Sequence, residues 1–368
     1  LEKGLCDGSC YALVCIGQAF GWHVNDYRSG YRFGKVGIDL VDASSQGRLP
    51  VREYIQGRTY FQFATRVMPW AKHLRAAVPI LRHAFEISFK IGDLTFAAAA
   101  CNNIAILLLA AGLPLDEVRQ EALGGLEISR RVRVPLSRDI IYICLSFIRM
   151  LQGKTGAFGS SDNVEFGDDW DEDRLHRDPA FAIASCYYWI YELQALVLAN
   201  RYSEAAKAMA NAERLIWSNS LAFPLADFHF YSALLQASLH DADVEQQSSH
   251  RDALAAHKRQ IDTWADACPD NFADRAALIG AEIARIDGHD LTAMRLYDEA
   301  IEFAHKHGFV QNEGIANEIA ARFYAHRGFA TISLTYLRNA RSCYAKWGAE
   351  GKVLQLEQCH PQLHDDSA

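Results

Sequence analysis

Two stretches near the C-terminal end of the chain repeat each other at an offset of 40 residues, the separation of Gly288 and Gly328. When these glycines are superimposed, Ala281 lies over Ala321. Apolar residues at helical spacing flank each glycine, so each stretch predicts two antiparallel helices joined by a short turn. Repetition of one helical hairpin restricts the fold to an elongated stack of such hairpins.

Glycines also follow helix-forming runs elsewhere in the chain. Glycine best adopts the left-handed conformation that ends many helices, so each of these glycines is expected to follow a helix C-terminus. The alternating pattern of β-strands is nearly absent, and we count about sixteen helices. The chain is therefore predicted to be all-α. The six glycines on which this prediction rests are Gly92, Gly112, Gly288, Gly308, Gly328 and Gly348.

Residues 288–301 resemble the tetratricopeptide (TPR) pattern, because Ala293, Tyr297 and Ala300 follow the turn glycine at the expected spacing. Small residues let the second helix of a hairpin approach the first, and the aromatic residue fills space toward the next hairpin. We therefore expect antiparallel hairpins stacked as a TPR-like superhelical solenoid. Two earlier segments repeat the spacing, with Ala205, Met209 and Ala212 in one and Gly30, Gly34 and Gly37 in the other.

One segment interrupts the helical pattern and divides the chain. We expect N-terminal hairpins over residues 1–153, an irregular acidic loop over 154–178, C-terminal hairpins over 179–359 and a tail over 360–368. The loop is either a solvated acidic segment or folds back onto a nearby basic cluster. That basic cluster consists of Arg130, Arg131, Arg133 and Arg138.

Composition limits the partners and the location of the protein. The 37 basic and 45 acidic residues give a formal net charge of -8, which disfavours nucleic acid as a partner. The apolar run 101–111 is shorter than the roughly 20 residues needed to cross a bilayer, so it predicts a buried helix and no membrane contact. The N-terminus lacks the pattern of a signal peptide and starts with Leu1. We expect a cytoplasmic segment of a longer protein.

Motifs for catalysis are incomplete. Residues 153–155 (Gly-Lys-Thr) match the end of a phosphate-binding loop, but Ile148 stands where the first glycine is required. Residues 176–178 (His-Arg-Asp) match part of a kinase catalytic loop, but Ile183 replaces the required asparagine. Neither paired Cys-x-x-Cys nor His-Glu-x-x-His occurs in the sequence. We predict no catalytic residue, no metal site and no cofactor in this segment.

A TPR-like array has a concave face lined by the first helix of each hairpin. On the TPR frame, five charged residues of the last two complete hairpins fall on this face. They either bind a charged or helical segment of a partner or form a solvated surface. These candidate partner-binding residues are Arg275, Glu282, Arg285, Glu318 and Arg322.

The chain resembles the helical repeat region of large bacterial signalling proteins. Those proteins join a serine/threonine-kinase-like domain, an AAA-type ATPase, helical repeats, a GAF domain and a sensor histidine kinase. The resemblance implies that the parent protein uses ATP and that this segment contacts a protein partner or neighbouring domains of the same polypeptide. It rests on residues 92–98, 187–190, 268–272, 281–285, 293–308, 320–324, 336–341, 344–349 and 351–353.

Our first hypothesis is an interaction module that regulates the ATPase or kinase of the parent. The alternative is a small-molecule sensor, in which Tyr187, Tyr188 and Trp189 line a pocket between hairpins. A third possibility, an enzyme, lacks the motifs described above. Four tryptophans near hairpin junctions are expected to be packing anchors, namely Trp189, Trp217, Trp264 and Trp347.

Overall fold

The computed structural model describes residues 6–45, 51–160, 170, 175, 177–219 and 222–363. These residues form sixteen α-helices and no β-strand, as expected for an all-α chain. The helices are α1 (Ser9–Val24), α2 (Tyr27–Ser45), α3 (Glu53–Arg66), α4 (Ala77–Lys90), α5 (Leu94–Ala110), α6 (Leu115–Arg131), α7 (Pro135–Leu151), α9 (Ala182–Leu198), α10 (Tyr202–Glu213), α11 (Pro224–Ala242), α12 (Gln247–Ala267), α13 (Pro269–Ile286), α14 (Asp290–His307), α15 (Val310–His326), α16 (Ala330–Trp347) and α17 (Glu350–Cys359).

Consecutive helices pair as antiparallel hairpins, which confirms the predicted solenoid. All six glycines expected at helix ends have a positive φ, between 72° and 84°. Gly308 and Gly348 directly cap α14 and α16 in the left-handed conformation. Any other L-residue would be strained at these positions, so the glycines fix where each hairpin turns.

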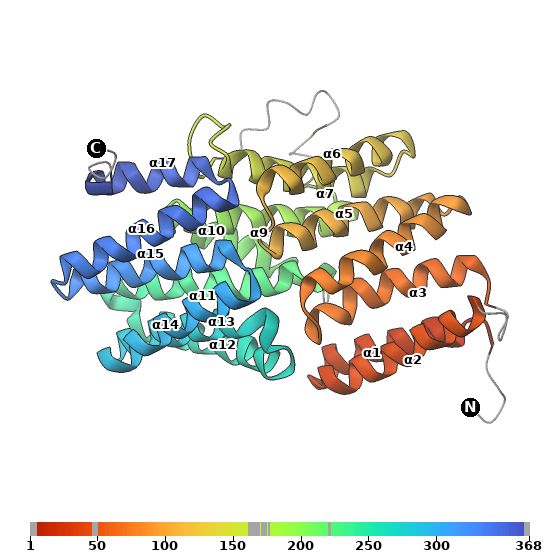
Figure 1. Ribbon diagram of the computed structural model, residues 1–368, viewed down its shortest axis with the longest axis horizontal. Helices are drawn as coiled ribbons and strands as arrows, with labels where there is room; N and C mark the ends of the chain where they lie inside the picture. Colours follow the sequence, from red (N-terminus) through yellow and green to blue (C-terminus); the bar gives the residue numbers. More distant parts are fainter. Residues whose placement is uncertain are drawn as a thin grey trace.

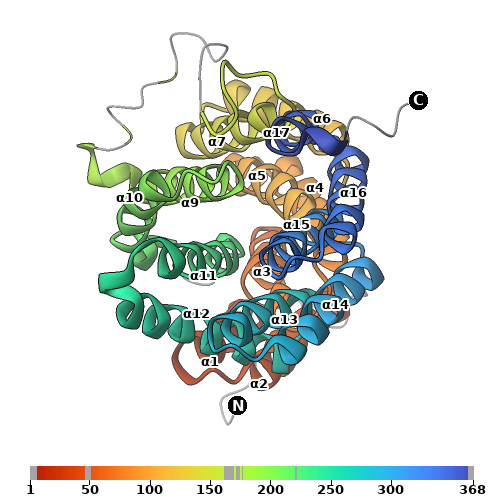
Figure 2. The same ribbon diagram turned by 90° about the vertical axis from the view of Figure 1, so that its left-hand side faces the viewer.

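The hairpins form two layers around a common axis (Figure 2). The odd-numbered helices from α3 to α15 lie inside, and the even-numbered helices from α4 to α16 lie outside. Each outer helix buries the residues along one of its sides. In α14 this side contains Ala293, Tyr297 and Ala300. These are the small and aromatic positions predicted from the TPR pattern.

Inner helices are buried on most sides, which explains their hydrophobic composition. The stretch Pro179–Leu198, which contains α9, is long and apolar enough to cross a membrane by composition alone. However, 78% of its most apolar window is buried inside the protein, as in the core helix of a packed array. The apolar run 101–111 likewise lies in α5 and its end and is buried, apart from the partly exposed Asn103, which confirms the predicted buried helix.

The superhelix makes more than one turn, and its second turn stacks against its first. Figure 1 shows the first half of the chain at the right and the last hairpins at the left along the same axis. Asn271 at the start of α13 binds the loop after α3, and the Gln311 amide nitrogen of α15 donates to the Ala110 carbonyl at the end of α5 (2.7 Å). Gly351 of α17 packs on Gly153 after α7. The contacts thus pair α3, α5 and α7, or the loops directly after them, each with the fifth odd-numbered helix that follows, namely α13, α15 and α17.

The contact between the two turns, which we call the seam, also has a hydrophobic part. Trp70 lies in a 3-10 turn, η1 (Met68–Trp70), in the loop after α3. Its ring centroid is 4.8 Å from that of Trp264 and 5.7 Å from that of Phe272, and it is nearly parallel to the Phe272 ring. The Trp264 indole donates to the Tyr27 hydroxyl (2.8 Å). One continuous core thus joins residues on both sides of the expected loop.

The boundaries of the predicted irregular loop stay a prediction. All of its acidic residues except Asp178 lie outside the described part of the chain, so its suggested contact with the arginine cluster is also untested. Of that cluster, Arg130 donates to the Tyr142 hydroxyl (2.6 Å) and Arg138 pairs with Asp139 (2.8 Å). Gly153 has a φ of +69° just after α7, so the Gly-Lys-Thr tripeptide directly follows a helix end.

Candidate functional site

The five residues predicted to line a concave docking face lie on the inner helices α13 and α15. However, the expectation that they are accessible is wrong for three of them, because Arg275, Glu282 and Glu318 are only 2%, 7% and 6% exposed. Their polar side chains bind other residues of the chain, such as Asp227, Asp241 and Lys352. Binding of a partner by these residues stays an untested prediction.

Arg275 forms a buried ion pair at the centre of the array. Its guanidinium lies 2.8 Å from the Asp227 carboxylate of α11 and over the rings of Phe223 and Phe230. Burial raises the pKa of Asp227, and the positive charge of Arg275 opposes this shift. The pair and the aromatic contacts join α11 to α13.

Glu282 and Arg285 form a second group about two helical turns further along α13. The Arg285 guanidinium is 2.9 Å from the Glu282 carboxylate and 3.0 Å from that of Asp241 in α11. The Tyr297 hydroxyl of α14 also donates to the Glu282 carboxylate. Both predicted residues therefore connect three helices and are occupied within the chain.

Glu318 and Arg322 belong to a third group that includes Lys352, which our sequence reasoning did not identify as a site residue. The Lys352 ammonium donates to Glu318 (2.8 Å), to the Leu198 carbonyl (2.8 Å) and to Gln355 (2.8 Å). All three ammonium hydrogens thus have an acceptor. Burial alone would raise the pKa of Glu318, but the charges of Lys352 and Arg322 outweigh burial and lower it.

A cavity of about 30 Å³ lies next to this third group. Tyr202, Glu318, Arg322 and Lys352 are among its lining residues, and Arg322 donates to the Tyr202 hydroxyl (2.8 Å). This volume holds one or two water molecules, not a peptide or an organic ligand. The interior near the predicted residues is therefore filled by the protein itself.

A second interior cavity, of about 20 Å³, lies beside Arg275. Polar atoms of four buried lining residues have no hydrogen-bond partner within the described residues: Arg275 Nε and Nη1, Gln194 Nε2, Gln311 Oε1 and Trp347 Nε1. A site with several such groups and this volume suits a bound water. It has no room for a larger molecule.

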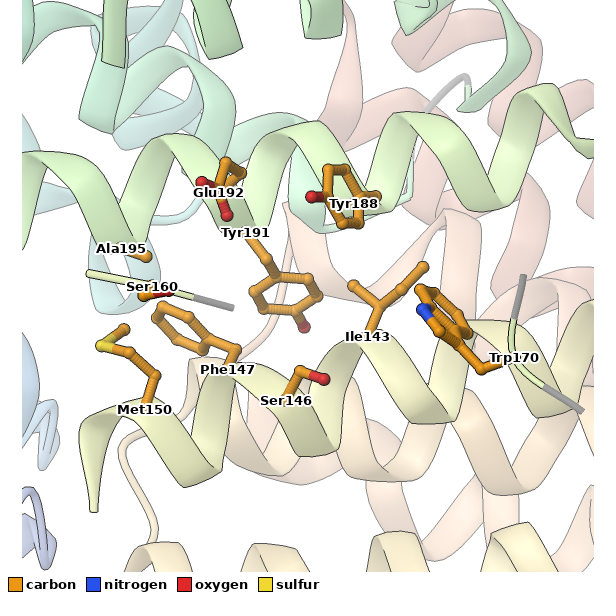
Figure 3. Close-up of a pocket in the computed structure, with 10 residues that line it drawn as sticks. All are labelled: Ile143, Ser146, Phe147, Met150, Ser160, Trp170, Tyr188, Tyr191, Glu192 and Ala195. Carbon is orange, nitrogen blue, oxygen red and sulfur yellow. The ribbon is translucent and has the colours of Figure 1, made fainter. Parts of the chain in front are cut away.

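A pocket lies between α7 and α9 (Figure 3). Elsewhere an outer helix covers the junction of adjacent inner helices, but no described helix does so here. Instead, Ser160 and Trp170 of the irregular segment lie over it, and Trp170 packs edge-to-face on Tyr142 with 5.9 Å between ring centroids. The remaining volume is about 20 Å³, too small for an organic ligand.

The aromatic run proposed to line one pocket is divided among different surroundings. Tyr188 lines the α7–α9 pocket, Tyr187 does not, and Trp189 lines a separate surface hollow of about 420 Å³. Consecutive residues point about 100° apart around a helix, so three in a row cannot share one pocket wall.

Trp217 borders the hollow that Trp189 lines and is 70% exposed, so its predicted role as a packing anchor is wrong. Trp264 and Trp347 are buried, as expected of anchors.

Comparison with known proteins supports TPR-like helical repeats in this chain. A family model described as CHK1-like, TPR repeats, matches residues 152–324. Hybrid signal transduction histidine kinase G of Dictyostelium discoideum is 29% identical over 121 residues, which cover 33% of this chain and 3% of that protein. The similarity therefore concerns a small part of a much longer signalling protein.

One solved structure aligns with nearly the whole length of this chain. It is titled "Circular tandem repeat protein with novel repeat topology and enhanced subunit contact surfaces" and is aligned over 98% of this chain and 97% of its own, with 12% identity and a TM-score of 0.26. A score this low does not indicate a shared fold. The TPR-like assignment rests on the hairpins themselves and on the family match, and TPR-like repeats indicate a protein–protein interaction module.

Proposed function

We propose that this chain is an interaction and regulatory module of a larger signal-transduction protein and carries no catalytic residue of its own. Its partners are another protein or the neighbouring domains of the same polypeptide, in the cytoplasm. The parent's ATPase or kinase domains supply the ATP chemistry. The TPR-like family match and the similarity to a hybrid histidine kinase support this proposal.

The observation that carries the proposal is the filled interior. Charged side chains that line the axis are bound to each other, as in the Arg275–Asp227 and Lys352–Glu318 pairs. With cavities there of only 20–30 Å³, the interior cannot hold a substrate. The surfaces left for function are the outer helices and the ends of the array.

The seam makes the array suitable for transmitting a contact. Because the second turn is hydrogen-bonded to the first, movement of one end displaces the other, unlike in an open array whose hairpins contact only neighbours. Regulation then consists of a shift between a docked and a released arrangement of the parent's domains. A ligand or partner shifts this equilibrium only by binding one arrangement more tightly.

The test uses the full-length natural polypeptide. Replacing residues 6–363 by a flexible linker should change basal autophosphorylation or ATP hydrolysis, or abolish their response to the physiological signal. Gly124→Ala is a matched control, because this glycine lies in α6 with open space around it and the substitution preserves the fold. Unchanged activity and an unchanged response after the deletion would rule out a regulatory role.

A further inference from the structure

The first hairpin exposes an apolar face at the end of the array. Ile16 of α1 and Phe33 and Val36 of α2 are 42%, 37% and 50% exposed. The opposite side of α1 is buried against α2 and α3, at Cys10, Val14, Gly17 and Gly21. A solenoid end that faces water normally carries a polar capping surface, whereas these three described residues expose apolar side chains.

The register of the repeat shows what this face corresponds to in the rest of the array. Both α2 and α16 bury residues at the fourth, eighth and eleventh helix positions. This alignment places Phe33 of α2 on Tyr336 of α16. The aligned buried sets are Gly30, Gly34 and Gly37 in α2 and Ser333, Leu337 and Ala340 in α16.

The two aligned aromatic residues make the same contact within their own hairpins. Phe33 stacks on Phe20 of α1, with 5.0 Å between centroids and 21° between planes. Tyr336 stacks on Tyr324 of α15, with 5.2 Å and 9°. The stacked pair therefore marks the same side of each hairpin.

In the last complete hairpin this side contacts the preceding hairpin. The Tyr336 hydroxyl donates to Asp298 of α14 (2.7 Å). Tyr297 of α14 also packs on Phe323 of α15, with 5.4 Å between centroids. Phe33 thus occupies the position from which the repeat contacts its predecessor, and the exposed face of α1 and α2 continues the interface that joins the other hairpins.

We propose that the exposed face of α1 and α2 binds a further helical hairpin of the same type, which precedes α1 in the natural polypeptide. The second helix of that hairpin carries an apolar residue at the position of Asp298 in α14. Asp298 accepts a hydrogen bond from the Tyr336 hydroxyl, and Phe33 has no hydroxyl to donate. The inter-hairpin contact joins two different faces, so two copies meeting through α1 and α2 would not reproduce it. This inference rests on the proposed role as an interaction module and specifies one surface of it.

The test is photo-cross-linking in the full-length natural polypeptide, with Phe33→benzoylphenylalanine as the probe. Mass spectrometry should find an intramolecular cross-link from this position to a helical segment before residue 1. The control places the same probe at Leu291, which is exposed on α14, and should give no cross-link to that segment. A cross-link to a second copy or to another protein, or none at all, overturns the proposal.

A second measurement separates this inference from the regulatory role. Ile16→Glu should lower the thermal midpoint of the longer polypeptide by about 1 °C, as expected for a loss of roughly 1 kcal/mol in an array of 368 residues or more, and leave that of chain 1–368 unchanged. Equal shifts in both overturn the inference. Neither result depends on whether the module changes kinase or ATPase activity.

Discussion

The Lys352 ammonium lies 2.8 Å from the Glu318 carboxylate, and both side chains are buried between α15 and α17. The same ammonium binds the Leu198 carbonyl, which lies 154 residues earlier at the end of α9. One side chain therefore ties the last helix to the middle of the array. This position makes the pair a sensitive test of how the interior is held together.

Lys352→Met should lower the free energy of unfolding by about 3 to 5 kcal/mol, because it leaves the Glu318 charge buried without its partner. The double variant with Glu318→Gln removes that charge and should recover part of the loss. Urea denaturation of both variants measures the difference. A loss below about 1 kcal/mol for Lys352→Met, typical of an exposed pair, would contradict the buried arrangement.

Asn271→Leu should open the seam between the two turns. The Asn271 amide nitrogen donates to the carbonyls of Pro69 and Lys72 (both 2.8 Å), and its oxygen accepts from the Leu74 amide (3.1 Å). Each buried group left without a partner costs about 1 to 3 kcal/mol. Hydrogen exchange should become faster at residues 68–76, whereas α9 should keep its protection. Unchanged exchange at residues 68–76 would show that the seam does not depend on this side chain.

Gly351→Ala should displace α17 from α7. An added Cβ would lie 2.5 Å from the Gly153 nitrogen and 2.7 Å from the Met150 carbonyl oxygen, so the backbones must move apart. The matched control is Gly124→Ala in α6, where a Cβ meets nothing within 4 Å and the better helix propensity should stabilise by up to about 1 kcal/mol. Thermal unfolding should show opposite shifts for the two variants. Shifts of the same sign would contradict the close approach.

The partly buried pair His229 and His257 should make stability depend on pH. Their Nδ1 atoms are 3.0 Å apart, and burial lowers the pKa of His229 to about 3 and that of His257 to about 4. Below the ordinary histidine pKa of about 6.5 the unfolded chain binds protons that the folded chain refuses, so stability is full above that pH and is lost as pH falls. At pH 5 the loss is about 2 kcal/mol per histidine.

Urea titrations at pH 7 and pH 5 check this expectation. The double variant His229→Leu with His257→Leu lacks both titrating groups. Its loss of stability between pH 7 and pH 5 should therefore be about 4 kcal/mol smaller than that of the natural sequence. The remaining histidines are common to both proteins and cancel in the comparison. The same pH dependence in the variant and the natural sequence would show that this pair is not buried in its neutral form.

Local features of the fold were predictable from sequence, and its closure was not. The glycine spacing and the small residues around Tyr297 determine the hairpins, since both depend on neighbours within about 40 residues. Whether the inner face is open depends on small rotations summed over many hairpins, which no single motif encodes. Arg275 and Glu318 were therefore placed on the correct helices but expected at a surface.

Some signals of the closed interior were present in the sequence. Asn271 and Gln311 are polar residues within the first helical turn of apolar inner helices, where a side chain can reach an unpaired carbonyl of another helix end. Lys352 follows Gly351, the close-packing glycine of α17. The exposure of Trp217 had no such signal, because it depends on how the segment after α10 leaves the array.

The step of five inner helices between the two turns limits how this array can evolve. An open solenoid tolerates the gain or loss of one internal hairpin, because every unit needs only its immediate neighbours. Here one extra unit between α7 and α13 would bring Asn271, Gln311 and Gly351 opposite the wrong carbonyl groups and glycines. Natural variants should therefore differ in length at the ends of the array or in the loops, and keep the number of units within each turn constant.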